Sequence, residues 1–166
     1  MKTFAHINLA GDIVGIGMIY FESGGLLPPV QKLVDEHGED AGIIAYGEYV
    51  KPDSALTTVL IKTSEMPNGS VIGAFDKTFR NAFKHGGGHK VNVDMPKAKE
   101  ISHEKRRLAR DAEMRPLDIE ATIPSKAARA EAKRQIIRDK YAAIQTDIET
   151  STTAEQLKTI VMSLQP

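Results

Sequence analysis

Within residues 1–94, short runs of alternating hydrophobic and polar side chains indicate β-strands. Residues 3–20 fit a β-hairpin, because an alternating run and a β-branched run flank the turn-forming sequence Ala10-Gly11-Asp12. This part of the chain is therefore predicted to be rich in antiparallel β-structure. Further strands are predicted at 43–46, 56–61 and 71–75, with turns at 51–54 and 66–70.

Glycines interrupt this pattern at two informative places. Gly15 and Gly17 fall on the same face of the second predicted strand, because successive side chains of a strand point to opposite faces. A face without side chains lets another backbone or an aromatic ring approach closely, although a bulge or crowded sheet packing is the commoner reason for glycine there. Gly38 is predicted to end a short helix over 30–36.

Residues 79–94 join the two parts of the chain. The run 79–84 fits either a strand or one helical turn, and we favour the strand because a glycine-rich loop at 85–89 and an apolar run at 91–93 follow it. Glycine adopts positive φ without steric cost, which suits a hairpin loop. Asp94 is placed to cap the next helix, since its carboxylate can accept hydrogen bonds from the free amides of the first turn.

From residue 95 onward, apolar positions recur every three or four residues, as along one face of a helix. A first helix is predicted from about Met95 to Arg115, and Pro116 is expected to break or kink it. The apolar stripe of this helix consists of Ala98, Ile101, Leu108 and Ala112.

Two more helices are predicted after Pro124. One begins at about Ser125 and carries a heptad-like stripe of apolar residues. A short third helix follows Thr152-Thr153-Ala154-Glu155, a capping-box pattern with threonine at the cap and glutamate three residues later. The stripe of the second helix consists of Ala130, Ile137, Tyr141, Ile144 and Ile148, and the inward face of the third of Leu157, Ile160, Val161 and Leu164.

These elements predict an α+β protein with two parts. Residues 1–94 form an antiparallel β-rich domain, and residues 95–166 form a helical hairpin or a three-helix arm. The stripe at 137–148 is most simply core of the helical part, but its length also suits an arm that docks on a partner. The candidate interface residues are Ile137, Tyr141, Ile144, Ile148, Ile101 and Leu108.

Composition narrows the functional classes. The net charge is zero, so bulk electrostatics do not draw the chain to nucleic acid. Cysteine is absent, which excludes disulfides, cysteine zinc sites and thiol nucleophiles. No apolar run approaches the roughly 18 residues of a membrane span, and the N-terminal run is a poor signal peptide. We expect a soluble protein that is not exported.

The residues with possible chemistry support no catalytic site. His85 and His89 could bind a metal, but an exposed loop with two solvated histidines is the better interpretation. The glycines between them lack the sequence context of a phosphate-binding loop. No nucleophile stands in a catalytic motif, so we expect no enzyme activity, no metal and no cofactor. The basic cluster of Lys105, Arg106, Arg107 and Arg110 is interpreted as a helix face neutralised by neighbouring carboxylates.

Several segments resemble small virion proteins of tailed bacteriophages that are encoded beside tail or tail-fibre genes. These segments are FAHINLAGDIVGIG, TFRNAF, VNVDMPKAKEISHEKRRLAR, PLD at 116–118, QIIRDKY at 135–141 and TTAEQLK at 152–158. The resemblance implies a structural protein of the tail or tail-fibre attachment region. An assembly chaperone for tail fibres that is not retained in the particle is the alternative.

The same resemblance implies the setting of the protein. Its partners would be other virion proteins of the tail, fibre or adaptor, and several copies would take part in one assembly. It would be made in the cytoplasm of the bacterial host and would reside in the virion. No membrane partner is expected, and nucleic acid is not an expected partner.

Overall fold

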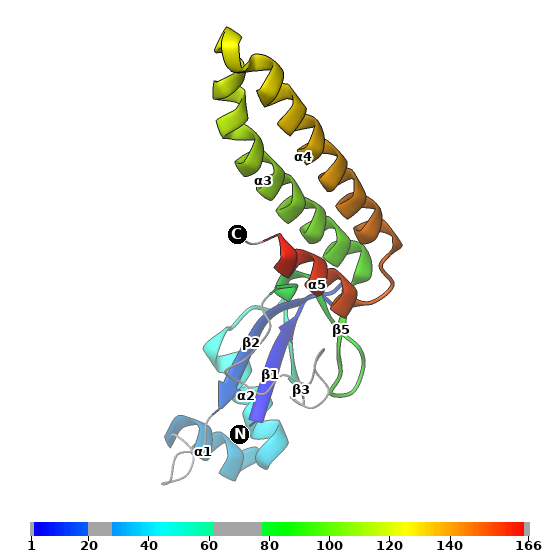
Figure 1. The fold of residues 1–166 in the computed structure, drawn as a ribbon. Coiled ribbons are helices and arrows are strands. Elements are labelled where there is room, and N and C mark those ends of the chain that lie inside the picture. Colours follow the sequence, from blue (N-terminus) through cyan, green and yellow to red (C-terminus); the bar gives the residue numbers. More distant parts are fainter. Residues whose placement is uncertain (1, 20–27, 62–77, 165–166) are drawn as a thin grey trace. The chain divides into compact units, whose positions relative to one another are not determined.

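The computed structural model describes residues 2–19, 28–61 and 78–164, and the fold is mixed α+β with small antiparallel sheets. Strands with short helices come first along the chain, and long helices follow (Figure 1). The chain divides into two compact units, Met1–Asp94 and Met95–Pro166. The predicted strand at 71–75 and turn at 66–70 lie outside the described residues.

The first unit is built on a three-stranded antiparallel sheet. Strands β1 (Lys2–Ile7), β2 (Ile13–Ile19) and β3 (Thr57–Ile61) lie in the order β2-β1-β3. The predicted hairpin is confirmed. In its turn the Asn8 side-chain oxygen accepts hydrogen bonds from the amides of Ala10 and Asp12, at 3.0 and 2.9 Å, and Gly11 has a φ of 79°.

Two short helices complete the core of this unit. Helix α1 (Pro28–His37) packs against α2 (Glu39–Val50), and α2 packs against β1 and β3. The core residues are Phe4, Val30 and Ile43, with Val34, Tyr46 and Leu60 packed around them. As predicted, α1 ends before Gly38, which has a φ of 83°.

The strand predicted at 43–46 is wrong, because these residues lie within α2. A four-residue apolar run does not distinguish a buried strand from a buried helix. Gly42 favours the helix here through packing, since a Cβ atom at this position would lie 2.5 Å from the Cα of Val34. The missing side chain therefore allows α1 and α2 to approach closely.

An aromatic ring occupies the space that the strand glycines leave open. A Cβ atom on Gly17 would lie 2.1 Å from the ring of Phe4, and one on Gly47 of α2 would lie 2.9 Å from the same ring. Phe4 is thus held between a strand glycine and a helix glycine. Close approach of an aromatic ring, the less favoured of the two explanations for glycine in this strand, is the one found at Gly17.

A second hairpin ends the first unit. It consists of β4 (Phe83–His85) and β5 (Val91–Val93) and follows the 3₁₀ turn η3 (Arg80–Ala82). The strand predicted over 79–84 is therefore correct only in its last two residues, because the chain first turns to bury Phe79 and Ala82. Positive φ angles at two loop glycines, Gly87 with 86° and Gly88 with 57°, agree with the predicted loop.

The second unit consists of three packed helices. Helix α3 (Met95–Ala121) and α4 (Pro124–Thr150) run side by side, and α5 (Ala154–Ser163) packs beside both (Figure 1). The N-cap of α5 is Thr153, whose capping box uses Gln156, one residue later than predicted. The buried residues are Ala98, Ser102, Met114 and Leu117 of α3, Ala130, Tyr141 and Ile148 of α4, and Leu157 and Val161 of α5.

Two predictions for α3 are wrong. The helix continues through Pro116 to Ala121, because the residues on both sides of the proline, Met114 and Leu117, are buried and hold the helix in place. The predicted stripe does not face the core along its length either. Ala98 at its start is buried and Ile101 is half-buried, but Leu108 is 64% exposed and Ala112 is exposed as well.

Candidate functional site

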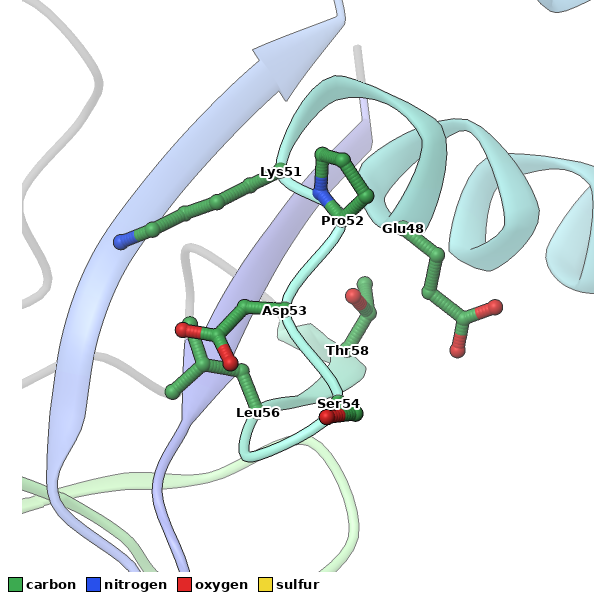
Figure 2. A pocket seen from close by; sticks show the side chains of 7 residues that line it. All are labelled: Glu48, Lys51, Pro52, Asp53, Ser54, Leu56 and Thr58. Carbon is green, nitrogen blue, oxygen red and sulfur yellow. The ribbon is translucent and has the colours of Figure 1, made fainter.

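An open pocket of about 620 Å³ lies where α2 ends and the chain turns toward β3. Figure 2 shows the side chain of Lys51 reaching across this pocket toward the neighbouring strand. The Lys51 ammonium lies close to Gly15 of β2, since a Cβ atom built there would be 4.0 Å from it. The lining residues are Glu48, Lys51, Pro52, Asp53, Ser54, Leu56 and Thr58.

Behind the pocket, His6 is buried in the sheet. Its Nδ1 and the hydroxyl of Thr58 are 3.2 Å apart, and its ring meets the edge of the Phe4 ring at a centroid distance of 5.4 Å. Burial lowers the pKa of His6 below 6.5, and the positive charge of Lys51 lowers it further. The imidazole is therefore held neutral.

Two polar side chains at this pocket are engaged within the fold. Asp53 accepts a hydrogen bond from the amide of Ala55 in its own turn, at 2.9 Å, and so stabilises the loop. The Nδ1 atom of His6 is engaged with Thr58 inside the sheet. These contacts account for Asp53 and His6 as parts of the fold.

A second candidate lies on the outer surface of α3. Leu108, Ala112, Pro116 and Ile119, here named the α3 stripe, follow one another at spacings of four, four and three residues and so share one helix face. All four are exposed, Leu108 to 64% and Ile119 to 67%. Exposed apolar side chains that are grouped on a surface mark an interaction site more often than scattered ones do.

Pro116 also belongs to an apolar groove between α3 and α4, here named the α3–α4 groove. The groove has a volume of about 360 Å³, and its apolar lining includes Ile136, which is 68% exposed. It is lined by Glu113, Pro116, Leu117, Lys133, Ile136 and Ile137. The exposed apolar surface of α3 therefore continues into the space between the two helices.

Charged residues interrupt and border the α3 stripe. Lys105 lies three residues before Leu108, and Arg115 lies between Ala112 and Ile119, so both fall in the same line along the helix. Within the described parts of the chain, neither side chain has a carboxylate within 4.0 Å. The predicted neutralisation of the basic cluster is therefore not formed at Lys105.

Glu113, one of the carboxylates near that cluster in the sequence, joins α3 to α4. Its Oε1 atom accepts hydrogen bonds from the Lys140 ammonium and the Tyr141 hydroxyl, both at 2.7 Å. These bonds lower the pKa of Glu113. Burial, together with the Glu113 carboxylate, raises the pKa of Tyr141 to about 12. Arg106 also crosses to α4 and donates to the backbone carbonyl of Tyr141 at 3.0 Å.

The six predicted interface residues are not brought together on one surface. Tyr141 and Ile148 are buried within the helical unit, whereas Ile101, Ile137 and Ile144 are half-buried. Leu108 alone among the six is fully on the surface, with the stripe around it. Pro116 and Ile119 were missed because the predicted helix stopped at Arg115, although their spacing from Ala112 was visible in the sequence.

The two loop histidines were predicted to be solvated, but each contacts a backbone carbonyl. His85 contacts the backbone carbonyl of Gly88 through Nε2 at 3.0 Å, and half-buried His89 contacts the carbonyl of Leu60 through Nδ1 at 3.1 Å. His89 thus fastens the glycine loop to β3. Among the residues the structure describes, no three His, Asp or Glu side chains are grouped closely enough to hold a metal ion.

Comparison with known proteins returned no match to a protein-family model, to a curated protein or to a solved structure. None of the helices in the described ranges combines the length and the apolar character that crossing a membrane requires.

Proposed function

We propose that this chain is a structural protein of a tailed bacteriophage particle that acts by docking on other proteins. It belongs to the tail or tail-fibre attachment region, is made in the host cytoplasm and has no enzymatic role. The helical unit is the docking arm, and its partners are other virion proteins. The α3 stripe is the observation that carries the docking part of the proposal.

The energetics of the stripe favour docking. Leu108 and Ile119 keep about two-thirds of their surface in water, at 64% and 67%. Fully burying a leucine or isoleucine side chain stabilises a complex by about 1.5–3 kcal/mol. The flanking groove residue Ile136 adds a further exposed apolar side chain on α4. A partner covering this surface would therefore gain several kcal/mol before the cost of association.

The phage setting is supported by the resemblance of the segments named above. Those segments include VNVDMPKAKEISHEKRRLAR and QIIRDKY, which form parts of α3 and α4. Of the α3 stripe, Leu108 lies in the first of these segments and Pro116 lies in PLD, whereas Ala112 and Ile119 lie outside them.

Mass spectrometry of purified particles tests the proposal. We expect the chain at a stoichiometric level in particles, and we expect the double variant Leu108→Asp with Ile119→Asp to be depleted from them, because two carboxylates in the interface would have to be desolvated. Met162→Asp on α5 is the matched control, since Met162 is also exposed, at 61%, and lies off the stripe.

The outcome separates the proposed role from its alternative. A chain that is absent from particles but required for fibre assembly is an assembly chaperone. Normal incorporation of the double variant would contradict docking through α3.

A further inference from the structure

The helix face that carries the α3 stripe also carries charged residues, and these limit what can cover it. Positions 101, 105, 108, 112, 115 and 119 alternate at spacings of four and three, which is the pattern of a helix seam that faces another helix. Lys105 and Arg115 occupy two of these positions. Both charged groups in the seam are therefore cations.

We infer that the α3 stripe binds an acidic amphipathic helix of a partner protein, with carboxylates opposite Lys105 and Arg115. This inference rests on the proposed docking function and adds the chemistry of the partner to it. The stripe from Leu108 to Ile119 spans about 16 Å, or three turns, which matches a short helix laid along it.

A second copy of α3 fits this seam poorly. In a parallel pair in register, Lys105 faces Lys105 and Arg115 faces Arg115. In an antiparallel pair that uses the whole stripe, Lys105 faces Arg115. Both arrangements bring like charges together in an interface, which is unfavourable and suppresses pairing. Carboxylates at these two positions of a partner would instead form ion pairs.

The rim of the stripe has the opposite sign. Glu104 and Asp111 border Leu108 on the other edge, one position to the side of the seam, and both are exposed. Groups at a rim stay in water and contribute less than groups in the seam. A partner with acidic seam positions and basic rim positions complements both features, so the charges also fix its orientation.

Two synthetic helical peptides test the inference on the full chain. Both peptides carry leucine at the heptad a and d positions except for the two that face Lys105 and Arg115. These two positions are glutamate in one peptide and lysine in the other. Fluorescence anisotropy measures their affinities. We expect the glutamate peptide to bind roughly tenfold more tightly, with a difference that shrinks at high salt.

Charge reversal supplies the matched control. Lys105→Glu with Arg115→Glu should reverse the preference, so that the lysine peptide binds more tightly. Arg107→Glu with Arg129→Glu changes the net charge equally at exposed positions off the seam and should leave the preference unchanged.

Three outcomes would overturn the inference: equal affinities, no binding of either peptide, or dimerisation of the chain that Leu108→Asp abolishes. In each case the docking function still stands if incorporation into particles depends on Leu108 and Ile119. If incorporation into particles did not depend on Leu108 and Ile119 while the glutamate peptide still bound more tightly, only the docking function would be contradicted.

Discussion

The imidazole of His6 links the stability of the first unit to pH. Its ring lies between the edge of Phe4 and the hydroxyl of Thr58, with the Lys51 ammonium as the facing charge. Only 5% of the residue is exposed, so protonation would bury a cation beside another cation. A neutral histidine satisfies this position and a charged one does not.

We predict that the first unit loses stability as the pH falls below about 6.5. The folded-state pKa of His6 lies below its ordinary value, so the unfolded chain binds the proton more readily. The contribution of neutral His6 to the free energy of unfolding is fully present above pH 6.5. It declines as the pH falls from 6.5 through the folded-state pKa, and it does not change further below that pKa. Denaturant unfolding at about pH 7.5 and pH 5.5 measures this, and His6→Gln should reduce the difference between the two.

His103 is the control for that experiment. Burial and the charge of Arg106 lower its pKa as well, and it lies on α3 in the other unit. His103→Gln should therefore leave the pH dependence of the first unit unchanged. An equal effect of both variants would contradict the assignment to His6.

At the level of elements, α3 shows that packing outweighs local preference. A proline in a helix interior removes one backbone hydrogen bond and clashes with the preceding turn, at a cost of roughly 3 kcal/mol. The helix nevertheless continues, because Leu117 is buried and ion pairs join the next turn to α4. These pairs are Asp118 with Arg134 at 3.0 Å and Glu120 with Lys133 at 3.6 Å.

Replacing that proline should strengthen the helix. We predict that Pro116→Ala raises the free energy of unfolding of the second unit by about 1–3 kcal/mol, since alanine restores the amide and favours the helix. Far-UV circular dichroism during urea unfolding measures the change. Ile119→Ala, at an exposed position without a backbone effect, should change stability by only a few tenths. A loss of stability in Pro116→Ala would show that the proline ring contributes packing in the α3–α4 groove.

The helix after Pro124 shows where the sequence predicted the fold well, and residues 43–46 show where it did not. Residues 125–150 carry an apolar stripe over many turns, and this helix was found with its buried Tyr141 and Ile148. Residues 43–46 were misassigned because a short apolar run fits both periods, and packing of Gly42 on Val34 decides between them. Periodicity located the apolar stripe of α3, but it could not reveal that the part around Leu108 faces water, since that depends on where α4 and α5 pack.

At the level of the molecule, the chain has two units with separate cores. Phe4, Val30 and Ile43 form the centre of the first. Tyr141, Ile148 and Leu157 are buried residues of the second, where α3, α4 and α5 pack on one another. The candidate docking surface could not be predicted in full, because an interface residue and a core residue have the same apolar signature in a sequence.

We predict that the fragment 95–166 folds by itself. Its three helices pack on one another, so circular dichroism should show a helical fragment with cooperative thermal unfolding. The fragment 95–150, which lacks α5, should unfold at a lower temperature, because Leu157 and Val161 are buried in the full chain. A fragment 95–166 without a cooperative transition would contradict the independence of the second unit.

The placement of Phe4 between Gly17 and Gly47 has a consequence for how the protein can evolve. Any side chain at either glycine would occupy space that the ring already fills, at 2.1 and 2.9 Å from the added atom. A larger residue at 17 therefore requires a smaller one at 4. A larger residue at 47 requires smaller ones at both 4 and 58, because its Cβ would also lie 2.6 Å from Cγ2 of Thr58. Positions 4, 17, 47 and 58, drawn from three strands and a helix, therefore vary together, and a larger residue at either glycine is viable only with compensating changes at its neighbours.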